Sequence, residues 1–222
     1  MCFSPEADLV AGIVIGVIGV DAFRHVRSPR ERPLAALPIV FAFHQLIEVV
    51  VWRGLQGHVD SGVWHAAAWL YLAVAFGVVP VLVPFAVAAL EPEEHRARAR
   101  SFVLLGALVA AVLMYAVVRG PVEARLEGHH IAYSVGLWHG GVVVALYVVA
   151  TTGSMLMSSL CYVRWVGLVN LVAVALLAWL NASGLISLWC IWAAVVSIGI
   201  ALHLRREPEA RVLPPRWEPV RS

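Results

Sequence analysis

Apolar residues in this chain are gathered into seven long stretches that short polar links separate. We expect helices at residues 5–23, 34–53, 63–90, 101–118, 131–155, 165–179 and 185–204. About 20 apolar residues in a helix cross the hydrocarbon core of a bilayer. The pattern therefore predicts an all-α membrane protein, with a single bundle of seven transmembrane helices over residues 1–204 and a disordered tail over residues 205–222.

The composition favours a membrane location and argues against one class of seven-helix protein. Of the 222 residues, 61% are hydrophobic and 14% are charged, which is more apolar surface than a soluble domain of this size hides. All 16 basic residues are arginine. Because retinal is attached to proteins through a lysine Schiff base, we expect no retinal.

The arginines also predict an orientation. If the N-terminus lies outside, thirteen arginines fall on the cytoplasmic side, and only Arg53, Arg119 and Arg125 fall outside. Cytoplasmic loops carry the excess of basic residues in membrane proteins. We therefore expect a multi-pass protein of the plasma membrane with its N-terminus outside and its C-terminus in the cytoplasm.

The stretch at 34–53 carries an ionisable pair, His44 and Glu48, inside the predicted span. The two residues are four apart and share one face of a helix, and Gln45 and Trp52 belong to the same stripe. A charged side chain near the bilayer centre costs about 2.5–3.5 kcal/mol, so such a pair indicates a functional site. The alternative is a structural role, in which His44 and Glu48 satisfy each other.

Further polar residues fall in the same outer half of the predicted bundle. His139 is expected to share a helical stripe with Tyr133, His65 begins the third stretch beside Trp64, and Cys190 lies in the last stretch. The inner half holds almost no ionisable residue within the spans. This asymmetry predicts a polar pocket that opens to the outside.

We expect this site to bind a transition metal or a small ligand. Zinc, copper or iron would be held by His44, Glu48 and His139, with His65 or Cys190 as a further ligand. A small ligand would contact Gln45, Trp52, Tyr133 and Trp138. The alternative for His65 is an anchor at the membrane interface, and for Cys190 it is packing between helices.

Several functions would use such a site. One is a membrane-embedded enzyme with Glu48 and His44 as catalytic residues, including a version in which Glu48 protonates a lipid or isoprenoid substrate and so starts a cyclisation or isomerisation. The others are a small-solute transporter and a membrane sensor or assembly subunit with a structural polar core. The expected partners are the lipid bilayer and a small molecule or metal, and not nucleic acid.

Three local expectations complete the prediction. Cys2 and Cys190 both belong to the outer, oxidising side. Two alternatives follow: the two cysteines are joined by a disulfide or a shared metal, or they are not linked. Prolines at 80 and 84 predict kinks in the third helix. The run Glu91-Pro-Glu-Glu94, followed by arginines, predicts a solvated cytoplasmic turn.

Three segments carry a resemblance to a known family. They are Met1-Cys2-Phe3-Ser4, Gln45-Leu-Ile-Glu48-Val-Val-Val-Trp52 and Ser187-Leu-Trp189-Cys190. With them the chain resembles a family of uncharacterised bacterial multi-pass membrane proteins. The resemblance implies no activity, and it adds only that Glu48, Trp52, Cys190 and Cys2 are positions of interest. The seven-helix zinc hydrolases do not fit, because their last helix should carry two histidines four apart and the last stretch here has only His203.

Overall fold

The fold was analysed in a computed structural model that describes residues 4–128, 130–137, 139–180 and 185–206, with the backbone alone for 177–180 and 185–191. Most of these residues are helical. The elements are α1 (Pro5–Arg24), η1 (Pro29–Glu31), α2 (Arg32–Leu55), α3 (Ser61–Ala73), η2 (Val74–Val78), α4 (Val79–Leu90), α5 (Glu93–Arg119), β1 (Val122–Glu127), β2 (His130–Val135), α6 (Gly140–Val148), η3 (Val149–Gly153), α7 (Ser154–Leu156), α8 (Cys161–Leu180) and α9 (Leu185–Arg205). The segments η2 and η3 are π-helical.

Three helical stretches in the described part of the chain are long and apolar enough to cross a membrane. They are Pro29–Leu55, Ser61–Leu90 and Glu93–Arg119. Shorter apolar helices cover Gly140–Leu156, Cys161–Leu176 and Trp192–Arg205. The predicted tail at 205–222 lies outside the described residues except for Arg205 and Arg206, and α9 ends at the first of these.

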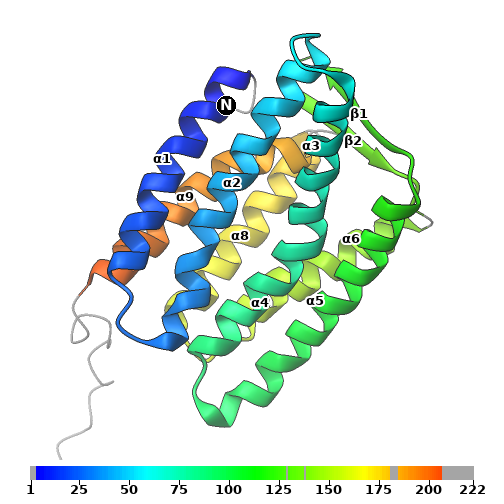
Figure 1. The fold of residues 1–222 in the computed structure, drawn as a ribbon. Helices are drawn as coiled ribbons and strands as arrows, with labels where there is room; N and C mark the ends of the chain where they lie inside the picture. Colours follow the sequence, from blue (N-terminus) through cyan, green and yellow to red (C-terminus); the bar gives the residue numbers. More distant parts are fainter. Residues whose placement is uncertain (1–3, 129, 138, 181–184, 207–222) are drawn as a thin grey trace, which may run out of the picture.

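Helices α1 and α2 pack side by side in opposite directions (Figure 1). Glycines on α1 permit the close approach, because a Cβ on Gly12 would meet Leu46 Cδ2 at 2.8 Å and one on Gly19 would meet Ile39 Cδ1 at 2.6 Å. Small residues at helix interfaces are what close packing in lipid requires. Helix α9 contacts both α1 and α2, so these three helices form one side of the bundle.

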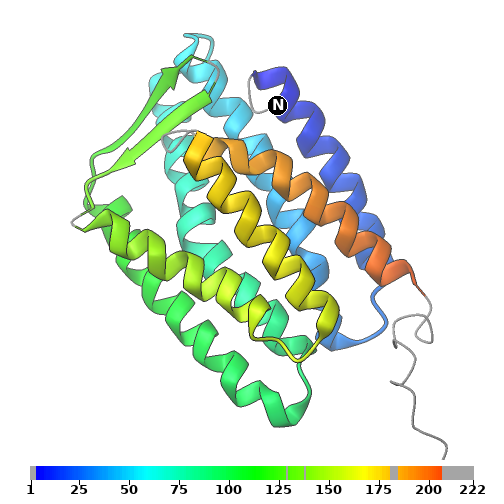
Figure 2. The ribbon, with the colours of Figure 1, turned by 180° about the vertical axis from the view of Figure 1, so that it is seen from behind.

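The helix predicted at 131–155 is wrong over residues 131–137. Residues before Gly140 instead contribute β2, which pairs antiparallel with β1 in a hairpin. The turn is made at Gly128, whose φ of +60° suits glycine. Ile131 is fully buried and packs in one cluster with Val51, Trp52 and Ala68. The hairpin thus lies at the end of the bundle where α1 begins (Figures 1 and 2).

The turn predicted to be solvated at Glu91 is also wrong for that residue. Glu91 is 1% exposed. Its carboxylate accepts hydrogen bonds from the Ser158 hydroxyl, from the Ser159 amide at 2.9 Å and from the Ser159 hydroxyl at 2.6 Å. Charge patterning does not reveal this contact, because the partners lie 67 and 68 residues away. Glu91 therefore ties the α4–α5 connection to the α7–α8 connection.

Candidate functional site

The polar stripe predicted on α2 is buried. His44 is 8% exposed, Gln45 1%, Glu48 0% and Trp52 4%. Gln45 faces α1, since a Cβ on Gly12 would lie 3.2 Å from the Gln45 Cβ. Four polar or amphipathic side chains along one face of α2 are thus buried.

A second buried acid, Asp8 on α1, was not predicted as part of this site. Asp8 is 0% exposed. The antiparallel contacts of α1 with α2 and the Arg53 Nη2 to Glu6 Oε1 hydrogen bond of 2.8 Å place the Asp8 turn level with the Glu48 turn. The signal was available in the sequence, because Asp8, Gly12 and Gly19 fall on the face by which α1 is buried. Two carboxyl side chains therefore lie enclosed near the end of the α1–α2 pair at which α1 begins.

On its other side, His44 belongs to a stack of three rings. The His44 and Tyr71 rings are 3.8 Å apart between centroids and 19° from parallel, and the Tyr71 and Tyr133 rings are 4.6 Å apart and 17° from parallel. Tyr71 is fully buried. The stack links α2, α3 and β2, so the hairpin helps to hold the histidine ring in place.

A cavity of about 430 Å³ begins at His44 and extends toward α6 and α8. Most of its wall is apolar, and its polar lining residues are His44, Tyr133, Ser134, Tyr147, Thr151 and Thr152. The buried Nε2 atom of His44 has no hydrogen-bond partner in the described part of the chain. Of the residues predicted for the site, His44 and Tyr133 line this cavity; Gln45, Glu48 and Trp52 do not.

The π-helical segment η2 forms one wall of the cavity. Within it the Val79 amide bonds to the Val74 carbonyl, five residues back. In the same pattern the Ala75 carbonyl would accept from residue 80, which is a proline and has no amide hydrogen. The Tyr147 hydroxyl instead donates to the Ala75 carbonyl at 2.9 Å. A π-helical turn thus precedes Pro80, and a hydroxyl group from α6 satisfies the carbonyl that the proline leaves without an amide partner.

The second π-helical segment, η3, lies across the cavity and contributes Thr151 and Thr152 to its wall. The Asn170 amide donates to the Thr152 hydroxyl at 2.7 Å, and the Trp192 indole donates to the Asn170 carbonyl oxygen at 2.6 Å. This buried chain of hydrogen bonds joins η3, α8 and α9. Single-turn π-helical segments are frequent at functional sites, and here two of them line one cavity.

Removing the Tyr147 hydroxyl tests whether η2 depends on it. We expect Tyr147→Phe to leave the buried Ala75 carbonyl unsatisfied, which costs about 1–3 kcal/mol and lowers the melting temperature by several degrees. Thermal unfolding of the purified protein, followed by tryptophan fluorescence, measures the change. Tyr115→Phe is the matched control, because Tyr115 is 61% exposed; an equal shift in both variants would contradict the assignment.

A comparison with known families adds one fact to this geometry. The model of a family of unknown function, DUF6629, matches residues 1–214. The chain belongs to DUF6629. No curated protein and no solved structure gave a significant match to this family member.

Two further predicted site residues of this DUF6629 member, His139 and His65, are not on the cavity wall. His139 is exposed and adopts a left-handed backbone at φ 57° just before α6. The helical stripe expected to join Tyr133 to His139 is therefore wrong, because Tyr133 lies on a strand. His65 is exposed, lies with its Nδ1 2.6 Å from the Ser61 carbonyl oxygen and stacks on Trp64 at 3.7 Å.

The described part of this DUF6629 protein contains no cluster of side chains that matches the predicted metal site. Among those residues, no group of three or more His, Cys, Asp or Glu side chains could hold a metal ion. Cys2 and Trp138 lie outside the described residues, as does the side chain of Cys190. The expected link between the two cysteines therefore stays a prediction.

Proposed function

We propose that this protein is a seven-span plasma-membrane protein, with its N-terminus outside, that binds a small and largely apolar molecule in the cavity beside His44. Three described helices long and apolar enough to cross a membrane support the location. The single observation that carries the binding function is a mostly apolar cavity of about 430 Å³ lined by His44, a buried histidine whose Nε2 atom has no hydrogen-bond partner among the described residues. Ligand sites are typically cavities of this kind, with few polar groups that fix orientation.

The lining restricts the chemistry of the ligand. The Tyr147 hydroxyl is occupied by the Ala75 carbonyl, the Thr151 hydroxyl by the Tyr147 carbonyl at 2.9 Å, and the Thr152 hydroxyl by Asn170. These three hydroxyls are therefore occupied, whereas the lining residue His44 has a buried nitrogen without a partner among the described residues. We infer a compact apolar ligand with one polar group, such as a hydroxyl or carbonyl, that bonds to the His44 ring.

Binding is favoured over acid catalysis by the position of Glu48. An acid that protonates a bound substrate must lie within hydrogen-bond reach of it. Glu48 is fully buried but is not on the cavity wall. The proposal therefore assigns His44 to ligand binding, and Glu48 and Asp8 to the buried polar packing between α1 and α2.

A cavity-filling variant tests the proposal. Val79 lines the cavity and is 8% exposed, whereas its neighbour Val78 is 41% exposed and does not line it. We expect Val79→Phe to reduce the amount of co-purified small molecule about tenfold or more, because the larger ring occupies part of the space of the ligand and a loss of about 1.4 kcal/mol is tenfold in affinity. Val78→Phe should retain it.

The measurement is mass spectrometry of an organic extract of the purified protein. His44→Ala should lower retention without filling the cavity, since it removes the polar contact. Circular dichroism shows whether each variant is folded. If wild type yields no molecule that the folded Val79→Phe variant lacks, the proposed function is wrong.

A further inference from the structure

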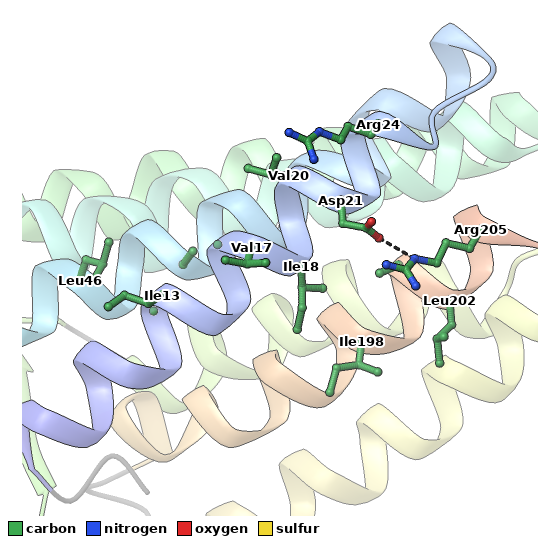
Figure 3. A pocket seen from close by; sticks show the side chains of 14 residues that line it. Ile13, Val17, Ile18, Val20, Asp21, Arg24, Leu46, Ile198, Leu202 and Arg205 are labelled. Atoms are coloured by element: carbon green, nitrogen blue, oxygen red, sulfur yellow. Dashed lines mark hydrogen bonds and ion pairs between the residues drawn. The ribbon is translucent and has the colours of Figure 1, made fainter.

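A second hollow, separate from the His44 cavity, lies on the outside of the bundle between α1 and α9. It is a groove of about 770 Å³ with part of α2 at its base. Figure 3 shows its walls, to which α1 contributes Ile13 and Val17 and α9 contributes Ile198 and Leu202. These four side chains are 47–66% exposed. Gly12 and Gly16 face α2 at the base of the groove, and the exposed side chains of α1 and α9 make its walls apolar.

The groove ends in charged residues. Asp21, Arg24 and Arg205 line this end, and the Nε–H of Arg205 donates to Asp21 Oδ2 at 2.7 Å (Figure 3). Arg24 is exposed and makes no hydrogen bond or ion pair with the described residues. Two guanidinium groups and one carboxylate therefore lie at the groove end, which leaves a net positive charge there.

The position of this end matches one leaflet of a membrane. From Gly12 to Arg24 the helix rises about 18 Å at 1.5 Å per residue, close to half of the roughly 30 Å hydrocarbon core. The charged end is formed where α1 and α9 both end, on the arginine-rich side of the bundle. By the excess of arginine this side is cytoplasmic.

We propose that the α1–α9 groove binds one anionic phospholipid from the cytoplasmic leaflet. An acyl chain lies along the apolar walls beside Gly12 and Gly16, and the phosphate is held by Arg24 and by the free Nη groups of Arg205. Guanidinium groups match phosphate oxygens in a bidentate geometry. The net positive charge selects an anionic headgroup over a zwitterionic one. This inference rests on the proposed membrane location and is independent of the ligand beside His44.

Native mass spectrometry of the delipidated full chain, titrated with phosphatidylglycerol or phosphatidylcholine of the same acyl chains, tests the groove. We expect the first bound lipid to prefer phosphatidylglycerol. Arg24→Gln should reduce that preference about fivefold, the effect of one basic residue on an anionic lipid. Arg100→Gln is the matched control, because Arg100 is exposed near the same end of the bundle and does not line the groove.

A steric variant tests the apolar part. Val17 and Val10 are both exposed on α1, at 66% and 61%, and only Val17 lines the groove. Val17→Trp should weaken phosphatidylglycerol binding, and Val10→Trp should not. Equal binding of the two lipids, an equal loss in Arg100→Gln, or a protein dimer that Val17→Trp dissociates would overturn the proposal. Val79→Phe should leave the lipid preference unchanged, which separates this test from that of the His44 cavity.

Discussion

Replacing Gly106 by alanine is expected to lower the melting temperature markedly. Gly106 on α5 lies directly against the backbone of α4: a Cβ at this position would overlap the Pro80 carbonyl oxygen and lie 2.9 Å from the Pro80 carbonyl carbon. A backbone group cannot rotate away as a side chain does, so α4 and α5 must separate. Overpacking of this kind costs about 1–3 kcal/mol or more, or several degrees in melting temperature.

The control for this prediction has the opposite sign. Gly199 lies in α9, and a Cβ there would have no neighbouring heavy atom within 4 Å. Gly199→Ala should therefore stabilise the protein slightly, because alanine is favoured over glycine in a helix by up to about 1 kcal/mol. Thermal unfolding in detergent, with size-exclusion chromatography for monodispersity, compares the two. A Gly106→Ala protein that melts at or above the wild-type temperature would show that α4 and α5 are not packed as described.

The close contact at Gly106 also bears on the His44 cavity. Pro80 lies two residues after the end of η2, and η2 contributes Ala75 to the cavity wall. Separation of α4 from α5 would therefore move that wall. We expect Gly106→Ala protein that remains folded to lose co-purified ligand together with stability.

The parts of the fold that could be predicted are those with a local signal. The apolar stretch at 34–53 with His44 and Glu48 four residues apart predicts a helix with a buried polar stripe, and α2 has that form. The hairpin could not be separated from a helix by hydropathy, because Ile131 and Tyr133 are apolar or amphipathic in either conformation. Their preference for strands was outweighed in the prediction by the long apolar run that follows.

The candidate site was predictable only in part, because its geometry depends on contacts between distant segments. His44 was identified from its position in a predicted span, but the cavity beside it is lined in part by two π-helical segments, which no residue pattern predicted. Asp8 carried a signal, its place in line with Gly12, but was not included in the predicted site. The buried partners of Asn170 and Glu91 are visible only once η3 and α8 are placed in space.

The second large effect is expected at Glu91, where one side chain connects two turns. Its carboxylate accepts three hydrogen bonds from Ser158 and Ser159, while the adjoining turn is held by Arg98, whose Nη2 donates to the Met157 carbonyl at 2.9 Å. Bonds to a charged group contribute about 1.5–3 kcal/mol each. Glu91→Ala removes all three and leaves their donors without an acceptor, so we expect a loss of at least 3 kcal/mol.

The pH dependence distinguishes the carboxylate from the mere bulk of the side chain. Burial is the largest single influence on the Glu91 pKa and raises it, but the hydrogen bonds from Ser158 and Ser159, with His95 nearby, outweigh burial and hold the pKa below its ordinary value of 4.5. A lowered folded-state pKa stabilises the protein above about pH 4.5, and this contribution is lost as the pH falls through the folded-state value.

We therefore expect the melting temperature of wild type to exceed that of Glu91→Gln at pH 7 and the difference to shrink as the pH is lowered below 4.5. Glutamine keeps the shape and one acceptor oxygen but does not ionise, so its own melting temperature should change less over this range. Glu94→Gln is the control, because the Glu94 side chain is 77% exposed. A difference between wild type and Glu91→Gln that stays constant from pH 7 to pH 3.5 would mean that the charge of Glu91 does not hold the two turns together.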